Sequence, residues 1–133
     1  MPLAVGAILA LVVGLFATAS GLDRDRAFYP TVTIVVASLY SLFAVMGASP
    51  HALVVESLIG VVFVVVGVAG FRWSLWLTVV ALGGHGVFDL FHDSVVFNSG
   101  EPMWWPAFCG AYDVTAAGYL TWLLVSGRTR AKP

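Results

Sequence analysis

Five apolar stretches, each long enough to cross a bilayer, constrain this chain more than any other feature of its sequence. They cover roughly residues 3–22, 28–48, 51–70, 73–93 and 104–126. A hydrocarbon core of about 30 Å takes about 20 apolar residues in a helix, and in lipid the backbone polar groups must bond within their own helix. The sequence therefore predicts an all-α fold: a polytopic membrane bundle of five transmembrane helices in a single domain, surrounded by the lipid bilayer.

The composition supports a membrane protein and argues against a soluble domain, a nucleic-acid-binding protein and a disulfide-stabilised fold. Of the 133 residues, 60% are hydrophobic and 10% are charged, whereas a soluble domain carries about 25% charged residues. Six basic and seven acidic residues leave a net charge of −1, so the basic stripe that nucleic-acid binding needs is missing. One cysteine cannot form a disulfide within the chain. We expect no nucleic-acid partner and no disulfide framework.

The basic residues indicate the orientation of the spans. All six follow the first, third or fifth stretch: Arg24, Arg26, Arg72, Arg128, Arg130 and Lys132. Basic residues mark the cytoplasmic side of a membrane protein, which predicts an N-terminus outside and a C-terminus in the cytoplasm of a bacterial cell, in the cytoplasmic (inner) membrane. Positive charge follows the first stretch rather than preceding it, which favours a retained anchor over a signal peptide.

Acidic residues inside the apolar stretches are the strongest indication of a functional site. Glu56, Asp89 and Asp113 each interrupt a predicted span, where inserting a carboxylate costs about 2.5–3.5 kcal/mol. At a rise of 1.5 Å per residue, all three lie within about 5–12 Å of the outer interface. No lysine or arginine lies in a span to neutralise them. We expect them to share one polar chamber in the outer half of the membrane.

Histidines and a cysteine extend this chamber. His85, Asp89 and His92 occur at i, i+4 and i+7 of the fourth stretch, which places them on one helix face. Cys109 and Asp113 share a face of the fifth stretch. The candidates for binding a metal or protons are Glu56, His85, Asp89, His92 and Asp113, joined by Cys109, by Tyr112 next to Asp113, and by Asp93 at the end of the fourth stretch.

This mixture of donors suits a divalent zinc, copper or non-haem iron ion. A metal would make the protein a candidate membrane oxidoreductase or hydrolase that acts on, or senses, a small or lipophilic ligand from outside. The alternative is a metal-free network in which histidines pair with carboxylates and neutralise their charge. Three acids and two histidines then share at least one proton near neutral pH, unless a divalent cation replaces it.

Tryptophans mark the outer start of the fifth stretch. Trp104 and Trp105 are typical of an aromatic belt at headgroup depth, and the alternative is a lid over the chamber. The preceding segment 98–102 has the composition of a turn and is suited to positioning such a lid.

A ridge of small residues follows the first stretch. Gly6, Ala10, Gly14 and Thr18 recur every fourth residue, a pattern that allows close helix approach. The ridge faces either the other helices or a second copy, so a homo-oligomer or a larger membrane complex is predicted as a partner. Two further functions stay open on this basis: a non-catalytic packing subunit of a complex, and an oligomeric proton-coupled transporter.

One segment resembles a known family. The run HGVFDLFH from His85 to His92 is followed by Asn98, Gly100 and Pro102, and then by WWPAFC and YDV up to Val114. This pattern resembles a family of small bacterial integral membrane proteins of undetermined function. The resemblance implies that the hairpin of the fourth and fifth spans is the characteristic element, and it implies no catalytic role for any residue.

Overall fold

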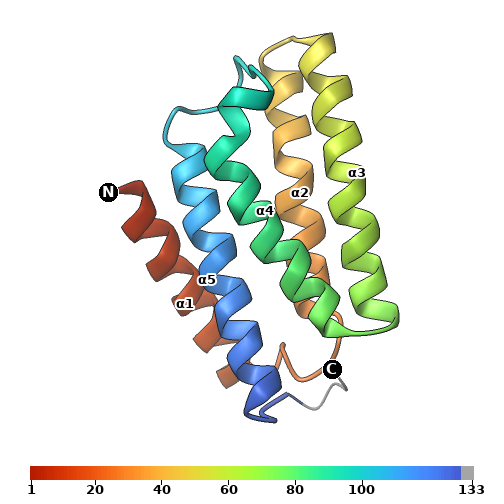
Figure 1. Cartoon of the computed structure of the whole chain (residues 1–133). Coiled ribbons are helices and arrows are strands. Elements are labelled where there is room, and N and C mark those ends of the chain that lie inside the picture. The colour runs from red at the N-terminus through yellow and green to blue at the C-terminus, as the bar shows by residue number, and fades with distance from the viewer. Residues whose placement is uncertain (130–133) are drawn as a thin grey trace.

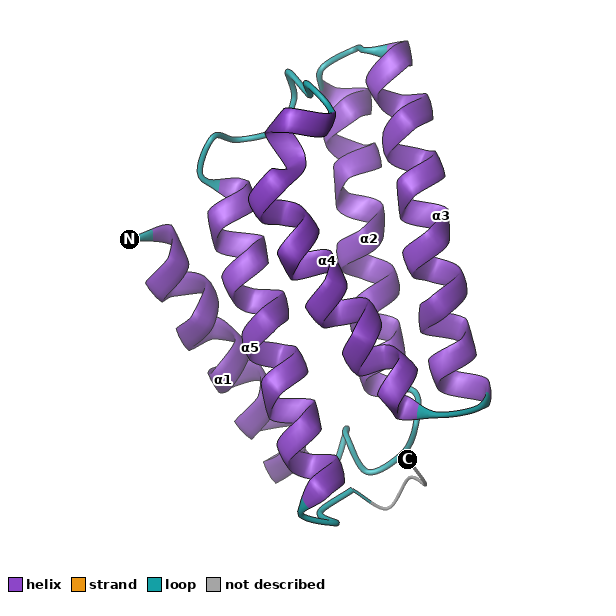
Figure 2. Ribbon diagram, in the orientation of Figure 1, coloured by secondary structure: helices purple, strands orange, loops and turns teal. Residues whose placement is uncertain are grey.

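The computed structural model describes residues 1–129, which form five α-helices joined by short loops (Figure 1). The helices are α1 (Pro2–Ser20), α2 (Phe28–Met46), α3 (Pro50–Arg72), α4 (Leu75–Val95) and α5 (Trp105–Val125). These 129 residues contain no β-strand (Figure 2). The all-α prediction is confirmed, and each predicted stretch matches one helix to within two residues at either end.

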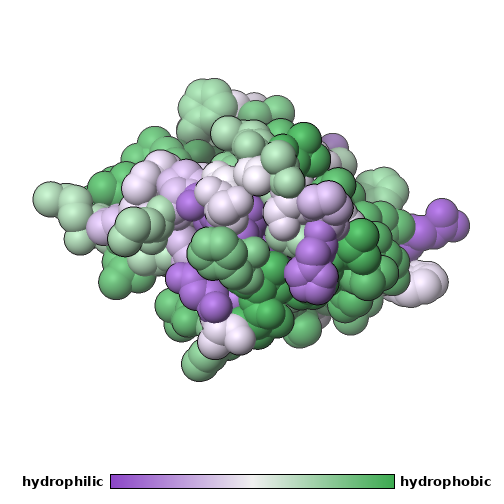
Figure 3. Space-filling model, turned by 90° about the horizontal axis from the view of Figure 1, so that it is seen from above, coloured by the Kyte–Doolittle hydropathy of each residue, from purple (hydrophilic) through white to green (hydrophobic). Residues whose placement is uncertain are grey.

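Four helices, α1 to α4, are long and apolar enough to cross a membrane. Their outward side chains include exposed large apolar residues such as Ile8, Phe16, Val62 and Val80. Seen from one end, apolar residues dominate the periphery of the bundle and polar residues gather toward the middle (Figure 3). These are the features of a multi-pass membrane protein. A fifth crossing, by α5, stays a prediction.

Local signals explain why the helix boundaries could be predicted. Ser49 caps α3 by accepting a hydrogen bond from the Ala52 backbone N–H at 3.2 Å, and Pro50 takes the first helical position, where its missing N–H costs nothing. At the end of α1, Gly21 adopts the left-handed conformation with φ of 83°, which glycine tolerates without strain.

The helices pack in two groups that α4 joins. α1 lies along α5, α2 lies along α3, and α4 contacts α5, α3 and α2 (Figure 1). The α1–α2 and α3–α4 connections and the end of α5 lie at one end of the bundle. The described basic residues are all there: Arg24, Arg26, Arg72 and Arg128. We call this the arginine end; Arg130 and Lys132 lie outside the described residues.

The small-residue ridge of α1 packs against α5 within the chain. A side chain at Gly6 would collide with the Phe108 carbonyl oxygen, and one at Gly14 would press on the Tyr119 ring. The Thr18 hydroxyl is 2.8 Å from the Tyr119 hydroxyl. Of the two surfaces that the sequence allowed for this ridge, the bundle itself takes it. Assembly with other chains stays a prediction.

Glycines also allow α4 and α5 to cross closely. A Cβ atom at Gly86 would lie 2.9 Å from the Gly110 carbonyl oxygen, and one at Gly110 would lie 3.0 Å from the Gly86 carbonyl oxygen. Each glycine directly follows a residue of the predicted chamber: Gly86 follows His85, and Gly110 follows Cys109. The close crossing therefore brings the polar faces of the two helices together.

Gly86→Ala is expected to destabilise the protein by about 1–3 kcal/mol, because the new methyl group meets backbone that cannot move away cheaply. Gly118→Ala is the matched control: Gly118 lies on an exposed helix face, and apart from its own helix backbone nearby no atom lies within 4 Å of its Cβ position. Alanine there should be neutral or stabilise by up to about 1 kcal/mol, since it favours the helix. Thermal unfolding in detergent measures both, and equal effects would contradict the close crossing.

Candidate metal centre

Helix α4 supplies the central residues because its buried face repeats every three or four positions. That face includes Leu82, His85, Asp89 and His92, and both histidines and Asp89 are buried almost completely. Two imidazoles and a carboxylate therefore enter the interior of the bundle from one helix. These three side chains of α4 lie between the middle of the bundle and the end opposite the arginine end.

Four donors from α4 and α5 converge in what we call the inner cluster: His85, Asp89, Cys109 and Asp113. The imidazole Nδ1 of His85 is 2.7 Å from Asp113 Oδ2 in a hydrogen bond, and 3.6 Å from Asp89 Oδ2. The Cys109 thiol points at Asp113 Oδ2, 3.8 Å away. All four side chains are buried, and one possible ligand atom from each lies within 4.8 Å of the others.

Two oxygens of the inner cluster have unused bonding capacity. Asp89 Oδ2 and Asp113 Oδ1 are buried and make no hydrogen bond within the described chain. Ligands of a tetrahedral zinc ion, at bond lengths of about 2.0–2.3 Å, lie about 3.3–3.8 Å apart. The distances between the four donor atoms, now up to 4.8 Å, would therefore need to shorten by about 1 Å for the cluster to hold an ion. The inner cluster fits a metal ion in donor chemistry and in scale.

The charge of the inner cluster also calls for a cation. Two carboxylates face one ring nitrogen of His85, and the arginines among the described residues lie at the other end of the bundle. A protonated imidazole would balance only one of the two carboxylates. A divalent cation would balance both with the histidine neutral, which is the form that binds metal. With Cys109 bound as a thiolate, one negative charge would remain on the site.

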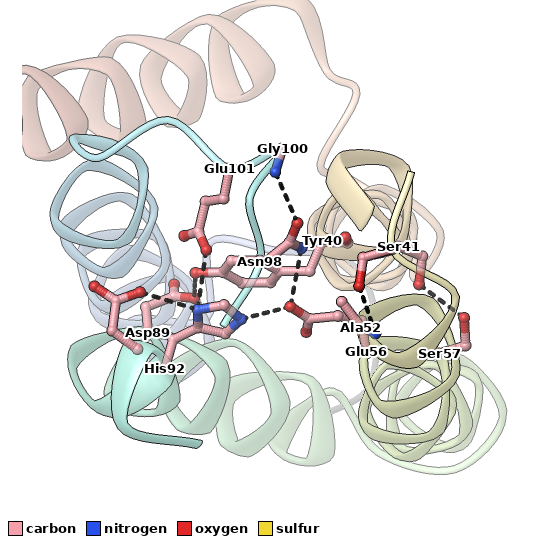
Figure 4. A network of polar contacts seen from close by, with 12 residues as sticks. Tyr40, Ser41, Ala52, Glu56, Ser57, Asp89, His92, Asn98, Gly100 and Glu101 are labelled. Carbon is pink, nitrogen blue, oxygen red and sulfur yellow. Dashed lines mark hydrogen bonds and ion pairs between the residues drawn. The ribbon is translucent and has the colours of Figure 1, made fainter. Parts of the chain in front are cut away.

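Three further residues form the outer cluster, which we define as Glu56, His92 and Glu101 (Figure 4). Nε2 of His92 is 2.7 Å from Glu56 Oε1, and Nδ1 is 3.0 Å from Glu101 Oε2. The Glu101 side chain is only 5% exposed although it belongs to the α4–α5 loop. The His92 ring therefore lies between two buried carboxylates.

Tyr40 of α2 joins the two clusters. Its hydroxyl donates a 2.7 Å hydrogen bond to Asp89 Oδ1, and its ring stacks on the His92 imidazole with centroids 3.9 Å apart and planes 13° apart. The five residues predicted to share one chamber are thus all buried in one region. They form two adjacent clusters with a tyrosine between them, rather than a single open space.

The α4–α5 loop closes over this region because Asn98 fastens it. The Asn98 side-chain amide donates to the Tyr40 carbonyl oxygen at 3.0 Å and to Glu56 Oε1 at 3.1 Å. Its own oxygen accepts from the Gly100 backbone N–H at 3.3 Å. Gly100 lies so close to the end of α2 that a side chain would collide with the Phe43 carbonyl oxygen. This anchoring delivers Glu101 to His92.

A cavity of about 250 Å³ opens beside the loop at this end of the bundle. It is lined by Asp93, Phe97, Asn98, Glu101, Pro102, Met103 and Pro106. Asp93 Oδ1 is 3.5 Å from His92 Nδ1, and its side chain is 84% exposed. Glu101 of the outer cluster lines this cavity, whereas Asp93 lines it with an exposed side chain rather than one in the interior.

Three predicted site residues lie elsewhere: Tyr112, Trp104 and Trp105. Tyr112 faces an apolar groove between α1, α2 and α5 because it points about 100° around the helix from its neighbour Asp113. Trp105 lines the same groove, and its ring packs edge-on against Phe43. Trp104 is half exposed beside it. The loop at Asn98 and Gly100 covers the clusters, and a lid formed by the tryptophans stays a prediction.

Sequence reasoning missed Tyr40 and Glu101 as site residues, and it assigned segment 98–102, which contains Asn98, only the role of positioning a lid. Tyr40 carried a usable signal, since a hydroxyl in the middle of an apolar span needs a buried partner. Glu101 lies between the fourth and fifth apolar stretches, and no local pattern shows that this loop folds inward.

Comparisons with protein-family models, with curated proteins and with solved structures found no match for this chain. The function must therefore be inferred from the geometry of the two clusters.

Proposed function

We propose that this chain is an integral membrane protein that binds a divalent transition-metal ion, zinc in the first place, at the inner cluster. The observation that supports it is the convergence of four buried donors, His85, Asp89, Cys109 and Asp113, two of which carry an unpaired carboxylate oxygen. Buried polar atoms without partners are uncommon in folded proteins, and an unseen ion is one established explanation.

The donor types narrow the metal. Nitrogen, sulfur and carboxylate ligands together suit zinc, whereas calcium and magnesium prefer sites made of oxygen alone. Copper and iron accept the same donors. The outer cluster lies between solvent and the inner cluster, so its carboxylates offer a path along which a cation leaves water in steps.

A second candidate function is a metal-free proton network. It is favoured by the two 2.7 Å contacts, His85 with Asp113 and His92 with Glu56, which already pair each histidine with a carboxylate. In this account the histidines carry the protons that neutralise the acids, and the network stabilises the bundle or relays protons between solvent and Asp113.

Zinc titration of the purified protein in lipid nanodiscs distinguishes the two. The metal account predicts about one zinc ion per chain, with protons released on binding because the donors must give them up. Calorimetry in buffers of different ionisation enthalpy measures both quantities. His85→Ala should weaken zinc binding by about 10–100-fold or more, and the matched control is His51→Ala, an exposed histidine outside both clusters.

The titration has two results that would contradict the metal account. One is the absence of binding by the intact protein. The other is zinc binding that His85→Ala leaves unchanged, which would assign the ion to another place such as the exposed His51.

Topology is a separate prediction. We propose five crossings in a bacterial inner membrane, with the arginine end in the cytoplasm, because basic residues favour that side. A cytoplasm-specific reporter fused after the last residue should be active, and a reporter active only outside the membrane should work when fused within the α4–α5 loop. Activity of the same reporter type at both fusion points would show that α5 does not cross.

A further inference from the structure

An apolar groove of about 330 Å³ lies between the two helix groups. α1 and α5 form one wall and α2 forms the other. The lining residues are Leu9, Val13, Phe28, Thr31, Val32, Val35, Val36, Leu39, Trp105, Phe108, Cys109 and Tyr112. Since α1 and α2 are apolar enough to cross a membrane, a groove between them faces lipid rather than water.

The shape of the groove suits one extended hydrocarbon chain. Its lining on α2 runs from Phe28 to Leu39, which is about 17 Å along a helix at 1.5 Å per residue. A ligand pocket holds about 300–1,000 Å³, so this one is small for its length and therefore narrow. Its lining is almost entirely aliphatic or aromatic.

Two features distinguish the groove from an ordinary lipid-facing surface. The indole Nε1 of Trp105 is buried and has no hydrogen-bond partner in the described chain, so it offers a donor to a ligand. Cys109, one turn further along α5, belongs both to the groove lining and to the inner cluster. The groove thus runs from the bilayer to the donors of the proposed metal site.

We propose that a lipid with one extended hydrocarbon chain and a carbonyl group enters this groove from the bilayer, accepts a hydrogen bond from Trp105, and lies against Cys109. This lipid is the ligand that the metal site acts on or senses. The link between the lipid and the metal site rests on the proposed function. Binding in the groove itself requires only the apolar lining and the Trp105 donor.

A photoactivatable fatty acid tests the groove directly. The probe is palmitic acid with a diazirine on its chain, added to the protein in nanodiscs of synthetic phosphatidylcholine and mapped by mass spectrometry after irradiation. Labelling is expected on groove residues such as Val32, Val36 and Phe108, to saturate, and to be displaced by unlabelled palmitic acid. Unsaturable labelling spread over the exposed helix faces would overturn the proposal.

Groove-filling variants sharpen the test. Val32→Trp occupies the groove and should lower the specific labelling by about tenfold. Val35→Trp, on the half-exposed rim, does the same with less risk to folding. The matched control is Val62→Trp, which changes an exposed residue of α3 outside the groove. Equal labelling of all three variants and the unchanged protein would also overturn the proposal.

The role of Trp105 has its own control. Trp105→Phe keeps an aromatic ring and removes the donor, so the apparent affinity for the fatty acid should fall by about two- to tenfold. A diazirine-bearing alkane without a carbonyl group should be unaffected. Trp104→Phe, at the half-exposed neighbour, should change neither probe. An equal loss for both probes would show that Trp105 contributes packing alone.

The zinc-binding variant separates this inference from the proposed function. His85→Ala lies outside the groove lining, so saturable labelling should persist in it. If the intact protein binds no zinc and labelling is saturable, the metal account fails and the groove stands. If zinc binds and labelling is unsaturable, the groove fails and the metal site stands.

Discussion

Asp89→Leu is expected to destabilise the protein by about 2–4 kcal/mol in the absence of metal, because the buried Tyr40 hydroxyl loses its acceptor and the His85 imidazole loses one of the two carboxylates that face it. The Tyr40 hydroxyl donates to Asp89 Oδ1 at 2.7 Å, and His85 Nδ1 lies 3.6 Å from Asp89 Oδ2. Asp89→Asn keeps an acceptor for Tyr40, so it should cost only about 1 kcal/mol. Thermal or denaturant unfolding in detergent with a chelator measures the difference.

Asp93 provides the matched control for these substitutions. It lies one turn further along α4, with its side chain 84% exposed. Asp93→Leu and Asp93→Asn should both change the free energy of unfolding by less than about 0.5 kcal/mol. If Asp89→Leu and Asp89→Asn cost the same, the hydrogen bonds of Asp89 do not stabilise the bundle, and the clusters lose their structural basis.

The affinity for zinc is expected to fall by at least about tenfold between pH 7 and pH 5. Histidine takes up a proton in this range, and a metal binds only the deprotonated donors. The sign follows directly: acid fills the lone pairs that the ion needs, so lower pH weakens binding. Titrations at several pH values measure it.

His51→Ala should show the same loss of zinc affinity as the intact protein, since His51 is exposed and outside both clusters. An affinity independent of pH over this interval would contradict a site in which His85 is a ligand.

The helices could be predicted because their signals are local. Lipid requires about 20 apolar residues per crossing, and Pro50 and Gly21 mark boundaries through their own backbone preferences. The face that carries His85, Asp89 and His92 follows from helix geometry alone. These features need no knowledge of which helix lies beside which.

The arrangement of the site depends on contacts between distant segments, which sequence spacing does not reveal. The hydrogen bond from Asn98 to the Tyr40 carbonyl joins residues 58 positions apart, and it decides that the loop folds inward. Glu101 becomes a buried partner of His92 only as a result. The division into two clusters likewise follows from Tyr40 stacking on His92, a contact between α2 and α4.

Tyr112 shows the opposite error. Its place beside Asp113 in the sequence suggested a shared space, yet neighbouring residues of a helix point about 100° apart. The structure turns Tyr112 into the apolar groove. Positions three, four or seven apart, such as Cys109 and Asp113, were better guides than adjacent ones.

X-ray absorption at the zinc edge of the metal-loaded protein tests the central claim most directly. The account predicts a four-coordinate ion with nitrogen and oxygen ligands at about 2.0–2.2 Å and one sulfur at about 2.3 Å. The sulfur contribution should disappear in Cys109→Ser, because the chain has no other cysteine. A six-coordinate shell of oxygen alone, or a protein that retains no zinc, would contradict a metal site built from His85, Asp89, Cys109 and Asp113.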